Sequence, residues 1–129
     1  MGSRKSKRSD KKVIIKKPWG FEDHVLIKDG FCVKRLVFWK GRMSSFHKHK
    51  KKGEVFFIRR GMVRVRFKIG ARIYKKGQFL YLPKGTLHQI INVGKSTLEI
   101  IEFSYPYVSK DVFRFEDPWA KLRKQKKLA

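Results

Sequence analysis

Residues 41–61, GRMSSFHKHKKKGEVFFIRRG, hold the pattern that decides the fold of this chain. His47 and His49 are two positions apart, so in an extended strand both side chains project from one face and Lys48 projects from the other. Imidazole nitrogens on one face of a strand are potential ligands of a divalent cation. On its own, such a pair is more often two surface histidines in a lysine-rich loop.

A carboxylate, that of Glu54, follows His49 by five positions. The basic residues 50–52 and Gly53 predict a turn, and Glu54 then opens the apolar run 55–58. Because the chain doubles back at the turn, Glu54 can face the two imidazoles. A carboxylate oxygen beside two imidazole nitrogens suits a borderline divalent cation.

A second stretch, residues 77–92 (GQFLYLPKGTLHQIIN), favours a metal site over two surface histidines. It predicts a strand, a tight turn over residues 83–85, and His88 at the start of another strand. The alternative for His88 is a core histidine that is satisfied by a backbone partner.

Together the two stretches resemble the paired signature of the cupin superfamily, G-x5-HxH-x4-E-x6-G followed by G-x5-PxG-x2-H-x3-N, and they match it at every position. The resemblance implies an all-β, single-domain cupin, a double-stranded β-helix or jelly-roll antiparallel barrel. It also implies one divalent metal ion, with zinc expected and Fe, Mn, Ni or Co as alternatives. The implied ligands are His47, His49, Glu54 and His88.

The remaining pattern agrees with an antiparallel barrel. Residues 62–68 alternate between apolar and basic side chains, which is typical of a half-buried strand. Asp29-Gly30 predicts a hairpin between strands over residues 21–28 and 31–39. The alternation in the second of these strands leaves open whether Lys34 or Arg35 points into the barrel.

Length and composition indicate one folded domain of 129 residues. We expect a disordered basic tail over residues 1–11, the barrel over 12–117, and a basic tail or short helix over 118–129. Cys32 is the one cysteine, which suits a reducing compartment. With no apolar run that could span a membrane or form a signal peptide, we expect a cytoplasmic protein without membrane contact.

The formal net charge of +24 is concentrated at the ends of the chain. Residues 1–17 hold eight Lys or Arg and one acidic residue, and residues 121–129 hold five Lys or Arg and no acidic residue. The tails thus supply half of the net charge. They predict only non-specific, salt-sensitive nucleic-acid binding, because no nucleic-acid-binding motif accompanies them.

Four further elements resemble the type II phosphomannose isomerase family within the cupins. They are KPWG (17–20), VKRL (33–36), IE (101–102) and DVFRFED (111–117). The resemblance implies interconversion of mannose 6-phosphate and fructose 6-phosphate through an enediol, with a divalent metal ion. The chain departs from the family at His47, where glutamine is usual, at Lys52, where arginine is usual, and at Gln89, where a basic residue is common.

The resemblance and the residue chemistry together nominate roles for polar side chains outside the metal set. Arg114 is the candidate for stabilising an enediolate or gripping phosphate, and Glu102 is the candidate base. Lys34, Arg35 and Lys52 are candidates for substrate phosphate. The alternatives are an ion pair of Arg114 with Asp111 or Glu116, a solvated Lys52, and a Glu102 that supports a ligand histidine.

Two other functions remain open at this point. An Fe(II)-dependent cupin oxygenase would use the same ligand set. A non-catalytic cupin would bind an anionic sugar or nucleotide. We also expect a homodimer, because the aromatic side chains exceed what one small core buries; those considered are Phe56, Phe57, Tyr105, Tyr107, Phe113 and Phe115.

Overall fold

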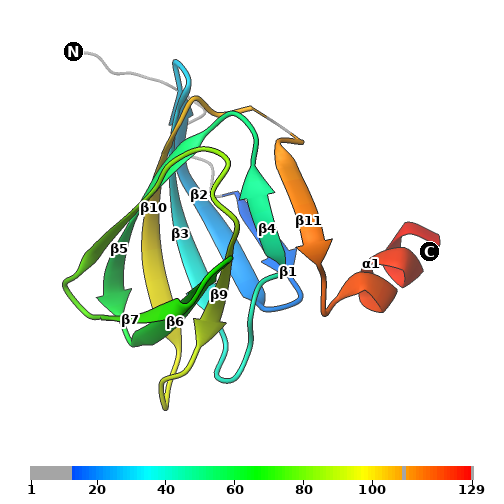
Figure 1. Cartoon of the computed structure of the whole chain (residues 1–129). Coiled ribbons are helices and arrows are strands. Elements are labelled where there is room, and N and C mark those ends of the chain that lie inside the picture. The colour runs from blue at the N-terminus through cyan, green and yellow to red at the C-terminus, as the bar shows by residue number, and fades with distance from the viewer. Residues whose placement is uncertain (1–12, 109, 129) are drawn as a thin grey trace.

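The computed structural model describes residues 13–108 and 110–128, which form eleven strands and one helix (Figure 1). The expected disordered tail over residues 1–11 lies outside these residues. The strands are β1 (Ile14–Lys17), β2 (Gly20–Lys28), β3 (Phe31–Phe38), β4 (Phe46–His49), β5 (Gly53–Arg60), β6 (Met62–Phe67), β7 (Ala71–Lys75), β8 (Phe79–Leu82), β9 (His88–Asn92), β10 (Leu98–Tyr105) and β11 (Val112–Glu116), and the helix is α1 (Ala120–Leu128).

The strands form two facing antiparallel sheets. A six-stranded sheet has the order β1-β2-β3-β10-β5-β8, and a five-stranded sheet has the order β11-β4-β9-β6-β7. Strands that are distant in sequence are neighbours in both sheets, so the chain crosses repeatedly between them, as expected for a jelly roll. The predicted all-β antiparallel barrel is confirmed.

The hairpin between β2 and β3 forms where Asp29-Gly30 predicts it. Asp29 and Gly30 have φ values of 52° and 84°. Positive φ at both central residues is required by the two-residue turn whose twist matches that of the flanking strands, and glycine meets this requirement without strain. The turn sets the register in which Leu26 lies opposite Val33, and a bulge between His24 and Leu26 then shifts the pairing so that His24 lies opposite Lys34.

The side chains that point into the barrel change from apolar to polar along the strands. On β3, the buried Leu36 and Phe38 lie toward one end, and Lys34 lies toward the other. On β10, Leu98 and Ile100 are followed by Glu102. The apolar end forms the core, where Trp19 stacks on Phe38 with ring centroids 4.0 Å apart. The polar end holds the inward-facing side chains that can bind a ligand.

The C-terminal segment closes the five-stranded sheet. β11 pairs with β4, which places Arg114 opposite His47, and sequence analysis did not predict this strand. Beyond it, the Trp119 indole Nε1–H donates to the Met43 carbonyl oxygen at 2.7 Å, and helix α1 follows. This helix lies within residues 118–129, where a basic tail or a short helix is expected. Among the described residues, no helix has the length and apolar character needed to cross a membrane.

Candidate metal centre and its cavity

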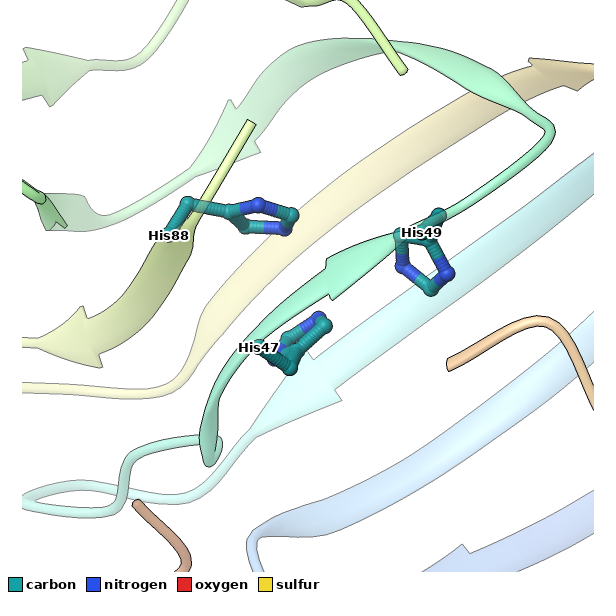
Figure 2. Close-up of side chains that lie close together, drawn as sticks. All are labelled: His47, His49 and His88. Atoms are coloured by element: carbon teal, nitrogen blue, oxygen red, sulfur yellow. The ribbon is translucent and has the colours of Figure 1, made fainter. Parts of the chain in front are cut away.

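Three histidines meet inside the polar end of the barrel (Figure 2). His47 and His49 project from the same face of β4, and His88 begins β9 directly opposite His47. One ring nitrogen of each residue can be chosen so that all three lie within 4.8 Å of one another. The i, i+2 spacing on β4 and the pairing with β9 therefore produce the cluster.

Backbone carbonyls orient two of the rings. The Nδ1–H of His47 donates to the Ser45 carbonyl oxygen at 2.8 Å, and the Nδ1–H of His88 donates to the Thr86 carbonyl oxygen at 2.9 Å. In each case the carbonyl belongs to the residue two positions earlier. This hydrogen bond selects the tautomer whose Nε2 carries a free lone pair, the arrangement that is usual for metal-binding histidines.

Glu54 reaches the cluster from the other sheet. Its Oε1 lies 3.5 Å from Nε2 of His49 and 3.5 Å from Nε2 of His88. These separations are longer than ordinary hydrogen bonds. Among the described residues, Glu54 Oε1, His88 Nε2 and His49 Nδ1 are buried without a hydrogen-bond partner.

Buried polar atoms without partners are unfavourable in a folded protein unless something else binds them. Three imidazoles and one carboxylate, converging from two sheets, are a donor set that suits a divalent transition-metal ion. The residues present therefore fit the expected cofactor.

Burial also sets the protonation state that metal binding needs. It lowers the pKa of His47 well below its usual value and lowers that of His88, and burial with the nearby charge of Lys52 lowers the pKa of His49 to about 3. All three rings are thus neutral at neutral pH, the form in which imidazole coordinates a metal. Burial, followed by the charge of Glu102, raises the pKa of Glu54 well above its usual value.

Lys52 and Glu102 form a buried ion pair beneath this cluster. Lys52 Nζ lies 2.9 Å from Glu102 Oε2 and 3.4 Å from Glu54 Oε2. Burial opposes ionisation of Glu102, but the charges of Lys52 and Lys34 hold its pKa below the usual value. The alternative of a solvated Lys52 is therefore wrong, since the residue is 5% exposed. Glu102 supports Lys52 and is not a free base.

His47, His49 and Glu54 line a cavity of about 250 Å³, and His88 lies directly behind them, with its Nε2 3.5 Å from Glu54 Oε1. Glu22 projects into it from β2 and accepts from His24 Nε2 at 3.0 Å, with Lys34 Nζ at 3.4 Å and Lys17 Nζ at 3.7 Å. Although burial opposes ionisation, the His24 hydrogen bond and the two lysines lower the pKa of Glu22 to about 2. Sequence analysis did not predict that Glu22, Lys17 and His24 belong to the site. The one signal for them in the sequence is the i, i+2 spacing of Glu22 and His24.

Arg114 lines the cavity without an ion pair among the described residues. Both of its expected alternative partners are used elsewhere: Asp111 accepts from the backbone N–H groups of Lys51 and Lys52, and Glu116 pairs with Arg66. Burial and then the charge of Arg123 lower the pKa of Arg114. Arg123 and Lys17 also line the cavity, but Arg123 is paired with Asp117 at 2.7 Å and Lys17 lies 3.7 Å from Glu22. Arg114 is exposed, and its charge has no such partner among the described residues.

The choice between Lys34 and Arg35 is settled by the register of β3. Lys34 is buried and lines the cavity. Arg35 points to the outside, where its guanidinium lies 2.8 Å from Glu99 and 3.4 Å from Asp23. The structure therefore does not bring Arg35 to the site.

Residues 3–117 match the family model described as "Mannose-6-phosphate isomerase C-terminal". The chain is 35% identical over 86 residues to the mannose-1-phosphate guanylyltransferase of Sinorhizobium fredii, covering 67% of this chain and 17% of the relative. It is 32% identical over 105 residues to the alginate biosynthesis protein AlgA of Pseudomonas syringae, covering 80% and 22%. The chain thus spans about a fifth of the length of these curated relatives.

Among solved structures, a cupin-like protein from Thermotoga maritima is similar with a TM-score of 0.68 and 20% identity, covering 81% of this chain and 82% of that one. At this level of identity the likeness shows the fold alone, and the fold is that of a cupin.

These comparisons correct the expected function. Several curated relatives are enzymes of mannose-related carbohydrate metabolism, but these are named mannose-1-phosphate guanylyltransferases and not isomerases. The expected interconversion of mannose 6-phosphate and fructose 6-phosphate is therefore wrong, and the names give no support to an oxygenase.

We predict that His88→Ala removes stoichiometric metal from the protein, because it deletes a buried ligand whose Nε2 has no other partner. Metal content by plasma mass spectrometry checks this outcome. In the parent chain, metal at about 100 times its dissociation constant should raise the free energy of unfolding by about 2.7 kcal/mol. His24→Ala, a histidine outside the cluster, should keep its metal; retention by His88→Ala or loss by His24→Ala would contradict the site.

We predict a pH-dependent loss of stability in Glu22→Gln. Because the folded-state pKa of Glu22 lies below its unfolded value of 4.5, its stabilisation is present above about pH 4.5 and is lost as the pH falls toward 2. Urea unfolding should show a loss of at most about 3 kcal/mol at pH 6 and a clearly smaller loss at pH 3. Glu116→Gln, in an exposed pair, should change stability by less than about 1 kcal/mol. Equal losses for Glu22→Gln at both pH values would refute the assignment.

Proposed function

The chain belongs to the mannose-6-phosphate isomerase C-terminal family of cupins, and from this premise we propose that it binds a phosphorylated mannose at a metal centre inside its barrel. The observation that carries the proposal is a single cavity with two kinds of binding group. His47, His49 and Glu54 line it, His88 completes the donor set beside them, and the guanidinium of Arg114, which has no carboxylate partner among the described residues, lines it too.

The proposed metal ligands are His47, His49, Glu54 and His88. Zinc is the proposed ion, and Fe, Mn, Ni or Co are the alternatives, because each accepts imidazole and carboxylate ligands. When bound, the ion supplies a Lewis acid that polarises oxygen atoms of the ligand. Lys52 and Glu102 hold Glu54 in place from beneath.

The proposed phosphate group lies against Arg114, with Lys17 and Arg123 adding positive charge. A guanidinium without a carboxylate partner is free to bind two phosphate oxygens at once. Glu22 and Lys34 then face the sugar, where a carboxylate accepts hydrogen bonds from hydroxyl groups and an ammonium donates to them.

Cavity size favours a small ligand. A volume of about 250 Å³ is below the ~300–1,000 Å³ of typical small-molecule sites, which favours a monosaccharide phosphate over a nucleotide sugar. Mannose 1-phosphate is the first compound to test, because it appears in the names of the relatives. Guanylyl transfer is not part of the proposal, since the chain spans about a fifth of those proteins.

We also propose a cytoplasmic location, consistent with the single thiol of Cys32, and a homodimer. The exposed aromatic side chains that would form its interface lie together on the outer face of the six-stranded sheet. They are Phe31, Phe79, Tyr81, Phe103 and Tyr105, and all of them except Phe79 border a groove of about 700 Å³. Phe56, considered earlier for this role, is 1% exposed and belongs to the core.

We predict that the metal-loaded chain binds mannose 1-phosphate and that Arg114→Gln weakens binding about 10- to 100-fold, the effect of losing a charge-assisted hydrogen bond of about 1.5–3 kcal/mol. Isothermal titration calorimetry measures the dissociation constants. Arg60→Gln, an exposed arginine that does not line the cavity, is the matched control and should bind normally. Equal affinity with and without metal, or equal weakening by the two substitutions, would overturn the proposal.

We predict that Tyr81→Asp converts the dimer to a monomer, because it buries a charge in the proposed interface. Sedimentation velocity gives the oligomeric state. Ile73→Asp, at an exposed apolar residue of the other sheet, should remain dimeric. A parent chain that is monomeric at high concentration would exclude the dimer.

A further inference from the structure

The positive charge of the folded part is unevenly divided between the two sheets. The described strands of the five-stranded sheet contain six basic residues and one acidic residue, Glu116. The basic residues are Lys48, Arg64, Arg66, Arg72, Lys75 and Arg114. The strands of the six-stranded sheet contain seven basic and five acidic residues, the acidic ones being Glu22, Asp23, Glu54, Glu99 and Glu102. The five-stranded sheet therefore carries positive charge that its own strands do not balance.

Alternation along β4 and β11 separates the cavity from an outer face. His47 and His49 point inward, so Lys48 between them points outward. Arg114 lines the cavity, so Phe113 and Phe115 on either side of it point outward. The two strands are hydrogen-bonded neighbours, with Phe113 opposite Lys48 (Figure 1).

Aromatic rings and ammonium groups interleave on this outer face. Lys48 Nζ lies 5.9 Å from the ring centroid of Phe113 and 5.7 Å from that of Phe115, and Lys50 Nζ lies 5.1 Å from that of Phe113. The two rings are 5.1 Å apart, and their residues are 45% and 54% exposed. Exposed phenylalanines among lysines leave apolar surface in water that a partner could cover.

The positive surface continues from this aromatic edge across the sheet. β9 lies beside β4 and is followed by β6, whose Arg64 and Arg66 alternate with the buried Val63 and Val65 and so point outward. Strands are spaced by about 4.8 Å, so the arginines lie roughly 10 Å from β4. Arg66 is paired with Glu116 at 3.1 Å, so these two charges balance each other, and Lys48, Lys50 and Arg64 remain without a carboxylate partner among the described residues. A line of positive charge thus leads away from the two rings.

We propose that the outer face of the five-stranded sheet, from Phe113 and Phe115 to Arg64 and Arg66, binds single-stranded nucleic acid. Bases stack on the two phenylalanine rings, and phosphates lie along the lysines and arginines. Aromatic rings combined with a basic track form the surface on which single strands bind without strict sequence preference.

Single-stranded nucleic acid fits this face better than other polyanions. A duplex keeps its base faces stacked inside, and a sulfated polysaccharide has no aromatic rings, so neither would use Phe113 and Phe115. The same face of a second copy carries the same positive charge, so the two faces would repel each other. The rings lie on a strand within a sheet, whereas membrane insertion is usual for amphipathic helices. The surface is separate from the cavity and independent of the proposed sugar-phosphate site.

The test must separate this face from the basic tails, which attract any polyanion. Phe113→Leu/Phe115→Leu removes both rings while it keeps the charge and apolar bulk of the full chain. Trp39→Leu is the control, because this ring is 44% exposed and belongs neither to this face nor to the proposed dimer interface. Fluorescence anisotropy with labelled oligothymidylate of about 12 nucleotides, at an ionic strength of about 0.15 M, measures affinity.

We expect the Phe113→Leu/Phe115→Leu variant to bind the oligonucleotide about tenfold more weakly or worse, since each stacked base contributes about 1–3 kcal/mol. Its affinity for heparin should be unchanged, and the control variant should match the parent chain. An equal change for oligonucleotide and heparin, or no change for either, would overturn the proposal. Loss of binding to phosphatidylserine vesicles without loss of oligonucleotide binding would assign the face to a membrane instead. Unchanged melting temperature and metal content verify that the variant is folded.

Discussion

The polar end of the barrel depends on the buried contact between Lys52 and Glu102. It joins residues 50 positions apart in sequence, and the same ammonium lies 3.4 Å from Glu54. Without Lys52, two carboxylates would be enclosed without a counter-charge, and removing one partner of such a pair is destabilising by about 3–5 kcal/mol. Glu54 can therefore stay inside the barrel, close to the three imidazoles, because Lys52 is beneath it.

Charge balance across the interior explains what the cavity accepts. Three carboxylates point inward, from Glu22, Glu54 and Glu102, and three ammonium groups accompany them, from Lys17, Lys34 and Lys52. The imidazoles are neutral, since burial lowers the pKa of each. Arg114, an exposed residue that lines the cavity, adds a positive charge without a carboxylate partner among the described residues, and a divalent cation on the donor set would add more. An anionic ligand such as a phosphorylated sugar would balance the positive charges of Arg114 and of the bound cation.

The resemblance to the cupin signature implied the cluster and the barrel, and local signals in the sequence agreed with it. The spacing of His47 and His49, the turn before Glu54 and the hairpin at Asp29-Gly30 each depend on a few adjacent residues. The burial of Lys52 was not predicted. Lys52 ends a run of basic residues that is typical of a solvated turn, and its burial depends on Glu102, which is distant in sequence. For the same reason the sequence left Lys34 and Arg35 undecided: their orientation follows from the register of β3 against β2 and β10.

Strand β11 contributes side chains both to the cavity and to the outer face of the barrel. Its pairing with β4 brings Arg114 opposite His47, and the two-residue period then requires Phe113 and Phe115 to face outward. Arg114 remains unpaired because nearby carboxylates have other partners: Asp111 accepts from the backbone before β5, and Glu116 accepts from Arg66 on β6. These contacts tie both ends of β11 to neighbouring elements. The strand that closes the cavity thus keeps its cation free for a ligand while it presents aromatic rings to the solvent.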